Sequence, residues 1–157
     1  MFDQINGLPV HALIVHAVVI FVPLLAVGAI VYALVARLRS KIGWAVGLLA
    51  VAAPISALVA MLSGNQLHQR LIDQGLKGRG AEILADHQGF GTLTFWLSLG
   101  LGVVTLVMLG LTLRKSSSLP KPADIGLSVL MVALAAAAGY YCFRTGDSGA
   151  MAVWGEY

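Results

Sequence analysis

Four apolar segments, each long enough to cross a lipid bilayer, constrain the fold of this chain more than any other feature. A membrane-spanning helix needs about 20 mostly apolar residues, and the sequence supplies such segments at 10–36, 42–63, 89–113 and 124–143. Of the 157 residues, 59% are hydrophobic and 11% are charged, whereas soluble domains carry about 25% charged residues. The sequence therefore predicts one integral membrane domain over 1–157, folded as an all-α four-helix bundle.

The polar connections between these segments predict an orientation. The two short connections are basic, and their charges come from Arg37, Arg39, Lys41, Arg114, Lys115 and Lys121. Cytoplasmic connections are enriched in lysine and arginine, so we expect both connections in the cytoplasm. The two termini, the polar loop 64–88 and the tail 144–157 are then expected on the periplasmic side of a bacterial cytoplasmic (inner) membrane. Because the basic residues are explained by topology, we expect a lipid bilayer and no nucleic acid as partner.

The four histidines, His11, His16, His68 and His87, all fall near this predicted periplasmic end. Ionisable side chains are costly inside a bilayer and are functional candidates where they occur. His11 and His16 are five residues apart, which turns a helix by about 140° and separates them by roughly 7 Å in depth. One regular helix therefore does not bring both rings to one small metal ion, whereas a large ligand can be contacted at two points.

Haem b is the leading candidate for that ligand, because a buried haem commonly takes histidines from two helices of a bundle. The sequence predicts His16 and His87 as the ligands of the haem iron. His11 and His68, nearer the membrane surface, are predicted to order a propionate or a bound quinone. The function that follows is electron transfer, or a role in a redox complex of the respiratory chain.

Other hypotheses use the same residues. A small metal ion held by histidines and carboxylates, drawn from Asp73, Glu82 and Asp86, is one of them. A proton path through His16 is a second, and a structural role for the histidines is a third. The chain also fits an accessory or assembly subunit of a larger respiratory or transport complex, or a homodimer. No catalytic residue is predicted, because the sequence has no phosphate loop, nucleophile elbow or paired buried carboxylates.

The tail contains GDSGA at 146–150, which resembles the nucleophile motif of trypsin-like serine proteases. That chemistry requires a histidine and an aspartate brought to the serine by a large soluble β scaffold, which a short apolar chain does not build. The glycines instead predict a tight turn. We expect Arg144 to pair with Asp147 and Trp154 to lie at headgroup level, so that the tail folds back and caps the outer face.

Three stretches of the chain, taken together, resemble a known family. They are GLPVHALIVHAVVIFVPL at 7–24, ADHQGFGTLTFW at 85–96 and RTGDSGAMAVWG at 144–155. With these motifs the chain is similar, over nearly its whole length, to small bacterial four-helix membrane proteins grouped as domain of unknown function 2231.

The resemblance implies an architecture and marks histidines without supplying a reaction. His11, His16 and His87 match the histidines of the family motifs, and His68 is a less certain match. Ala12 departs from the usual LPxHPLxVH pattern, in which proline is common at that position. The departure removes a helix breaker, so the first helix is expected to begin early. Relatives that are fused or adjacent to redox modules favour a respiratory context.

Overall fold

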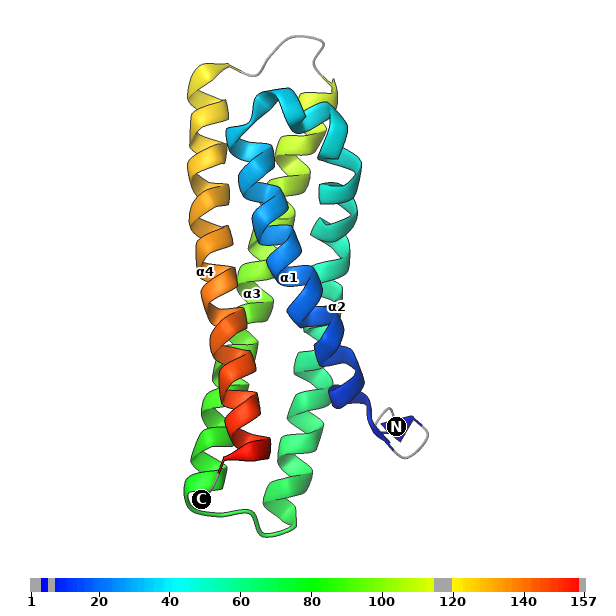
Figure 1. The fold of residues 1–157 in the computed structure, drawn as a ribbon, viewed down its shortest axis with the longest axis vertical. Helices are drawn as coiled ribbons and strands as arrows, with labels where there is room; N and C mark the ends of the chain where they lie inside the picture. Colours follow the sequence, from blue (N-terminus) through cyan, green and yellow to red (C-terminus); the bar gives the residue numbers. More distant parts are fainter. Residues whose placement is uncertain (1–3, 6–7, 115–119, 156–157) are drawn as a thin grey trace.

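A computed structural model describes residues 4–5, 8–114 and 120–155 of the chain. Within these residues, four helices are long and apolar enough to cross a membrane. They are α1 (Val10–Leu34), α2 (Arg39–Asp73), α3 (Arg79–Arg114) and α4 (Lys121–Trp154). The helices run alternately in opposite directions along one bundle (Figure 1), and α1 packs between α2 and α4, diagonally opposite α3. The predicted all-α four-helix bundle is confirmed.

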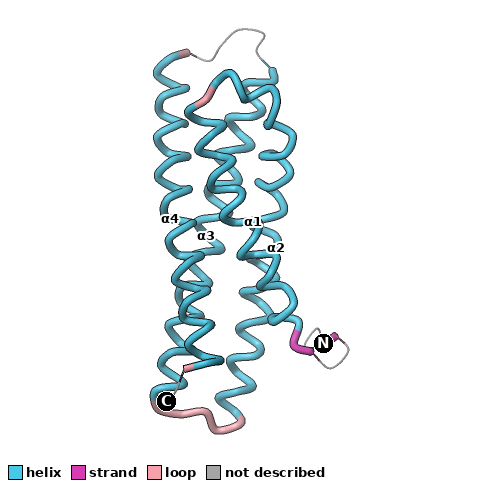
Figure 2. The backbone as a smooth tube through the Cα atoms, in the orientation of Figure 1, coloured by secondary structure: helices cyan, strands magenta, loops and turns pink. Residues whose placement is uncertain are grey.

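Short elements flank the first helix. The strands β1 (Gln4–Ile5) and β2 (Leu8–Pro9) pair antiparallel just before α1, and the 3-10 turn η1 (Ala36–Leu38) joins α1 to α2. Both termini lie toward the same end of the bundle (Figure 2). We call this end, which carries His11 and His87, the histidine end, and the opposite end, which carries Arg39 and Asp124, the arginine end.

The predicted loop 64–88 is wrong as a loop, because most of it is helical. Helix α2 continues to Asp73 and α3 already begins at Arg79. Two positive-φ glycines, Gly75 and Gly78, make the turn. The N–H of Gly75 bonds to the carbonyl of Ile72 (2.9 Å) and the N–H of the next residue bonds five residues back, which is the Schellman pattern that ends a helix at a left-handed glycine.

The predicted helix ends differ elsewhere for the same reason. Helix α4 runs on to Trp154 instead of ending at 143, so the tail 144–155 is three further helical turns and does not fold back. Hydropathy marks the apolar part of a helix, whereas the backbone continues to form i→i−4 bonds into the polar part. The bilayer interior is about 30 Å thick, and the 35 residues of α2 span about 52 Å. Polar helical turns therefore extend beyond the apolar segments.

The centre of the bundle is packed with a few large side chains among many small ones. Tyr32, Leu25, Leu101, Met108 and Met131 are fully buried. Alanines fill the remaining contacts on α1, α2 and α4, and the close packing of small residues is what holds helices together in lipid. Buried hydroxyl groups line α3, where Thr94 and Ser98 donate to carbonyls three or four residues earlier and Thr105 has no hydrogen-bond partner among the described residues.

A close contact between α2 and α3 follows from a proline. Pro54 lies inside α2 and has no N–H to donate to the carbonyl of Ala50, so that carbonyl loses its helical partner. It faces Gly102 of α3, where an added Cβ would lie 2.4 Å from the oxygen. The absence of a side chain at Gly102 lets its backbone approach the unsatisfied carbonyl, a geometry that suits a Cα–H···O contact.

We predict that Gly102→Ala destabilises the bundle. The new methyl group would overlap the Ala50 carbonyl, and such overpacking costs about 1–3 kcal/mol. The matched control is Gly110→Ala on the same helix, where nothing lies within 4 Å of the added Cβ; it should be neutral or stabilising, since alanine favours a helix by up to about 1 kcal/mol. Thermal unfolding in detergent measures both, and equal melting temperatures for the two variants would contradict the contact.

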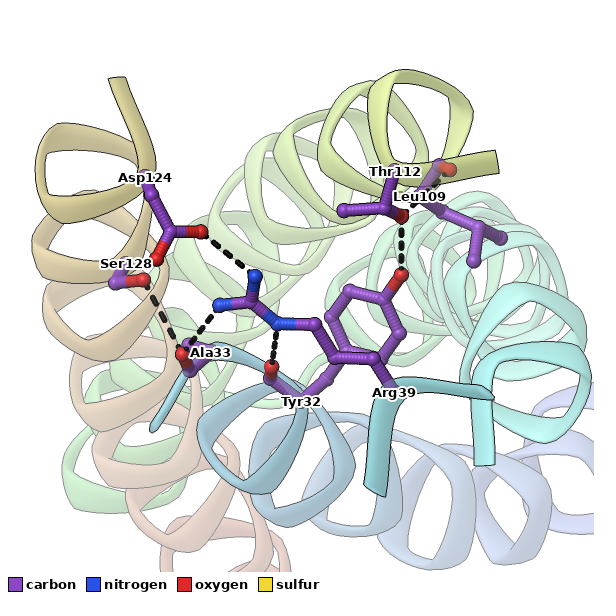
Figure 3. Close-up of polar contacts among 7 residues, drawn as sticks. All are labelled: Tyr32, Ala33, Arg39, Leu109, Thr112, Asp124 and Ser128. Atoms are coloured by element: carbon purple, nitrogen blue, oxygen red, sulfur yellow. Dashed lines mark hydrogen bonds and ion pairs between the residues drawn. The ribbon is translucent and has the colours of Figure 1, made fainter. Parts of the chain in front are cut away.

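The arginine end is closed by one guanidinium group (Figure 3). Arg39 donates to Asp124 at 2.7 Å and to the carbonyls of Tyr32 (2.9 Å) and Ala33 (2.8 Å). It thereby satisfies carbonyls at the C-terminal end of α1 and ties them to the first turn of α4. The hydroxyl of Tyr32 also bonds to Thr112 of α3 at 2.6 Å. The cytoplasmic location of this end stays a prediction. Lys115, one of the basic residues on which that prediction is based, lies outside the described residues.

We predict that Arg39→Met loosens the arginine end. The substitution keeps the aliphatic stem but removes the ion pair and both carbonyl contacts, and hydrogen bonds to a charged group contribute about 1.5–3 kcal/mol. We expect the free energy of unfolding to fall by about 2 kcal/mol, measured in detergent against Lys41→Met, whose side chain is exposed on the same helix. A loss no larger than that of the control would show that the clamp is dispensable.

Candidate functional site

His11 lies in the first turn of α1 and contacts α2. Its Nδ1 bonds to the carbonyl of Ala60 at 2.9 Å. The ring also lies against Gly64, one turn further along α2, where an added Cβ would be 2.9 Å from Cε1 and 3.0 Å from Nδ1 of His11. The ring is therefore held between a carbonyl and a glycine of the neighbouring helix.

His87 lies in the third turn of α3 and contacts α4 in the same way. Its Nδ1 bonds to the carbonyl of Thr145 at 2.9 Å and is 3.2 Å from the Ser148 hydroxyl. The ring lies against Gly149, where an added Cβ would be 2.9 Å from Cε1 and 3.2 Å from Nδ1. Part of the serine-protease-like motif thus lies against a histidine, but its serine bonds to a carbonyl one turn earlier, at 3.1 Å.

The two rings face each other across the histidine end. Their centroids are 6.0 Å apart and their planes are nearly perpendicular, at 87°. Since α1 and α3 are diagonally opposite, this contact lies between all four helices. Both side chains are partly buried, and a small pocket beside His11 is lined by Pro9, His11, Ser63, Leu67 and Arg70.

The hydrogen bonds determine which ring nitrogen is available. A carbonyl oxygen only accepts, so Nδ1 of His11 and Nδ1 of His87 must carry the proton. In a neutral imidazole the other nitrogen, Nε2, then has a lone pair and no hydrogen. Within the described residues neither Nε2 makes a hydrogen bond. The pair therefore offers two lone pairs, which suit a metal ion or a hydrogen-bond donor and not another acceptor.

The structure does not bring His16 to His87, the pair predicted from the sequence. His16 is exposed on the outside of α1, and its Nδ1 bonds to the carbonyl of Ala12, four residues earlier on the same helix, at 2.9 Å. The five-residue spacing explains this, because only one of two residues about 140° apart can face the bundle centre. The one that does so is His11.

His68 belongs to a separate polar chain on the helical turns beyond the apolar segments. Its Nδ1 bonds to the amide oxygen of Gln88 at 2.5 Å, and the amide nitrogen of Gln88 donates to Asn65 at 2.8 Å. This chain ties α2 to α3 next to His87.

The predicted capping role of Arg144, Asp147 and Trp154 needs correction. All three lie on the straight continuation of α4, where Trp154 is 84% exposed and Asp147 is exposed. Arg144 lies 4.5 Å from the centroid of the Phe90 ring and donates to the hydroxyl of Tyr140 at 2.9 Å. The part of the tail that does cover a histidine consists of residues the sequence analysis missed as contacts, namely Thr145, Ser148 and Gly149.

A signal for the missed residues was present in the sequence. Ser-Gly occurs at 63–64 and again at 148–149, and each glycine lies under one of the two paired histidines. The predicted cluster of histidines and carboxylates is not formed, since no group of three histidine, cysteine, aspartate or glutamate side chains among the described residues is placed to hold a metal ion.

The chain matches the family described as predicted membrane protein (DUF2231) over residues 7–156. The chain belongs to this family. The DUF2231 match covers all four helices and both histidine contacts, so the family resemblance of the sequence motifs is confirmed. Searches of curated proteins and of solved structures found no match.

We predict that His11 and His87 stabilise this DUF2231 bundle and that His16 does not. Each of the first two rings bonds to a different helix, and losing such a bond costs about 1–2 kcal/mol. His16→Ala removes only a bond within α1 on an exposed face, so its effect should stay within about 0.5 kcal/mol. Denaturant unfolding in detergent measures the three alanine variants, and a loss for His16→Ala as large as that for His11→Ala would contradict the placement.

Proposed function

We propose that this membrane protein binds haem b at the histidine end, where His11 and His87 would hold the iron, and that it serves electron transfer in the bacterial cytoplasmic membrane. One observation carries the proposal: two imidazoles from diagonally opposite helices, each with Nε2 unbonded, lie 6.0 Å apart. The proposal replaces His16 of the sequence-derived pair by His11 and keeps His87.

The number of ligands favours haem over a bare metal ion. Structural zinc takes four protein ligands and catalytic zinc takes three, whereas the described residues contain no cluster of three ligating side chains. Haem iron needs only two axial ligands from the protein, because the porphyrin supplies the others. A pair of histidines is therefore a complete protein contribution for haem and an incomplete one for zinc.

The spacing and the hydrogen bonds also suit this role. The two rings lie close enough, with centroids 6.0 Å apart, for one ligand to contact both. Ligating histidines usually donate the other ring N–H to a carbonyl or carboxylate, which fixes the tautomer and makes the ligand more basic. His11 and His87 both donate from Nδ1 to a backbone carbonyl.

The protein's own contribution is to hold and orient the two rings. When bound, haem iron would supply one-electron transfer, whose potential depends on its axial ligands, their hydrogen bonds and burial. Ala60 and Thr145 provide the carbonyls that set ring orientation. The site lies where α2 and α3 leave the apolar segments, so a redox partner in the aqueous phase could approach it.

The structure supports the other hypotheses less well. A proton path through His16 is disfavoured, because His16 lies outside the bundle and bonds to its own helix. An accessory subunit without a cofactor would use the hydrogen bonds of His11 and His87 from Nδ1 and would make no use of their unbonded Nε2 nitrogens. A respiratory-chain partner, another membrane complex or a second copy of the chain remains part of the proposal.

An absorption spectrum tests the proposal. We expect protein purified from bacterial membranes, or titrated with haem in detergent, to show a Soret band and a reduced-minus-oxidised spectrum typical of two histidine ligands. His11→Ala and His87→Ala should each lose the low-spin spectrum and lower haem affinity by at least about tenfold. The matched controls His16→Ala and His68→Ala should keep both.

Two outcomes would overturn the proposal. Absence of any haem spectrum, both as isolated and after titration, would exclude the cofactor. Loss of the spectrum in His16→Ala but not in His11→Ala would exclude the assigned pair.

A further inference from the structure

The contacts of His11 with α2 form a small unit of four residues, which we call the His11 unit: His11, Ala60, Ser63 and Gly64. The carbonyl of Ala60 accepts a hydrogen bond from Nδ1 of His11 at 2.9 Å. The hydroxyl of Ser63 lies 3.2 Å from the same carbonyl and 2.8 Å from the carbonyl of Val59. Gly64, one residue after the serine, leaves the space in which the ring lies.

The contacts of His87 with α4 repeat this arrangement, and we call them the His87 unit: His87, Thr145, Ser148 and Gly149. The carbonyl of Thr145 accepts from Nδ1 of His87 at 2.9 Å and from the hydroxyl of Ser148 at 3.1 Å. In both units the serine follows the accepting residue by three positions and the glycine follows it by four. In both, an added Cβ on the glycine would lie 2.9 Å from Cε1 of the ring.

The helices that carry the two units are arranged equivalently. Helices α1 and α3 run in one direction, and α2 and α4 return in the other (Figure 1). The hairpin α1–α2 and the hairpin α3–α4 are therefore related by an approximate two-fold axis along the bundle. The two rings meet at 6.0 Å, as two equivalent groups beside such an axis would.

We infer that the chain contains two copies of one histidine-holding unit, with Ser63–Gly64 and Ser148–Gly149 as the positioning residues that present both imidazoles as the Nδ1–H tautomer toward a shared axis. Glycine leaves room for the ring, because a Cβ at this position would lie 2.9 Å from Cε1 and force the ring to move. The serine hydroxyl lies within hydrogen-bond distance of the accepting carbonyl in both units, and in the His11 unit it also reaches the carbonyl of Val59. The GDSG stretch therefore serves to position a histidine, and its serine is not a nucleophile.

The equivalence also restricts the ligand. Both rings donate from Nδ1, so the nitrogen that remains available to a ligand is the same atom, Nε2, in both units. A single electron-pair acceptor, such as a metal centre with two open positions, fits this arrangement. This restriction rests on the proposed function, whereas the equivalence of the units does not depend on any ligand.

Nitrogen NMR of the ligand-free protein tests the inference directly. The chain has four histidines, so a sample labelled with ¹⁵N only in histidine gives four ring spin systems, assigned through single alanine variants. We expect His11 and His87 both to show a protonated Nδ1 and an unprotonated Nε2. A dominant Nε2–H tautomer at either ring would overturn the inference.

Glycine substitutions test the positioning role. Gly64→Ala should displace the ring signals of His11 and leave the Nδ1–H signature at His87, and Gly149→Ala should do the reverse. The matched control is Gly146→Ala on α4, where nothing lies within 4 Å of the added Cβ, and it should leave all four signals in place. An unchanged His11 spectrum in Gly64→Ala, or an unchanged His87 spectrum in Gly149→Ala, would overturn the inference.

Serine variants cover the case in which a glycine variant does not fold. Ser63→Ala and Ser148→Ala remove no packing volume beyond one hydroxyl, and each should shift the ring nitrogen signals of its own histidine only. If only one of these two variants changed the spectrum of its histidine, the two units would not be equivalent. In haem titrations the same variants should lower affinity by about 10–100-fold, the usual effect of losing a group that orients a ligand.

The two proposals fail in distinguishable ways. Absence of a haem spectrum with both Nδ1–H tautomers intact would overturn the proposed cofactor and keep the paired units. A haem spectrum in a protein whose histidines have different tautomers, or do not respond to the glycine variants, would overturn the paired units and keep the cofactor.

Discussion

The lack of water in the bilayer interior is the constraint on which the rest of this structure depends. Every buried backbone group must find its partner within the protein, which makes the apolar segments helical and leaves exceptions with specific causes. Pro54 leaves the carbonyl of Ala50 without a helical partner, and Gly102 approaches it. At the arginine end, Arg39 donates to two carbonyls near the end of α1. At the histidine end, two imidazoles donate to carbonyls of neighbouring helices. The polar side chains at both ends therefore connect helices to one another.

The histidine contacts differ from the arginine contacts in the number of side-chain nitrogens that remain without a hydrogen bond. Arg39 uses each of its guanidinium nitrogens in a hydrogen bond. Among the described residues, His11 and His87 each use Nδ1 in a hydrogen bond to a carbonyl and leave Nε2 without one. Two such nitrogens on diagonally opposite helices can accept a hydrogen-bond donor or a metal ion. The physical case for a bound cofactor in this DUF2231 protein therefore rests on the unbonded nitrogens, and the hydrogen-bonded nitrogens explain why the rings are held still.

The sequence predicts the bundle well because segment length and apolarity follow directly from bilayer thickness. It predicts helix ends poorly: hydropathy ends the second helix at Ser63, while the backbone continues to Asp73 until Gly75 adopts a left-handed conformation.

The sequence also does not determine whether His11 or His16 faces the centre of the bundle. A five-residue spacing indicates that only one of them faces inward, but which one depends on the rotation of α1 against α2, and that is set by packing partners far away in the chain. The two Ser-Gly pairs are visible in the sequence, but their contacts with His11 and His87 can be predicted only once it is known which helices are neighbours.

The ring-to-ring contact between His11 and His87 is the central claim, and magnetisation transfer between histidine rings tests it most directly. In protein labelled only at histidine and embedded in lipid nanodiscs, four residues contribute ring signals, so each cross-peak identifies one pair. The account predicts a cross-peak between the ring protons of His11 and His87, whose centroids are 6.0 Å apart, and none between His16 and His87. A cross-peak between His16 and His87, without one from His11, would contradict the account and restore the pair predicted from the sequence.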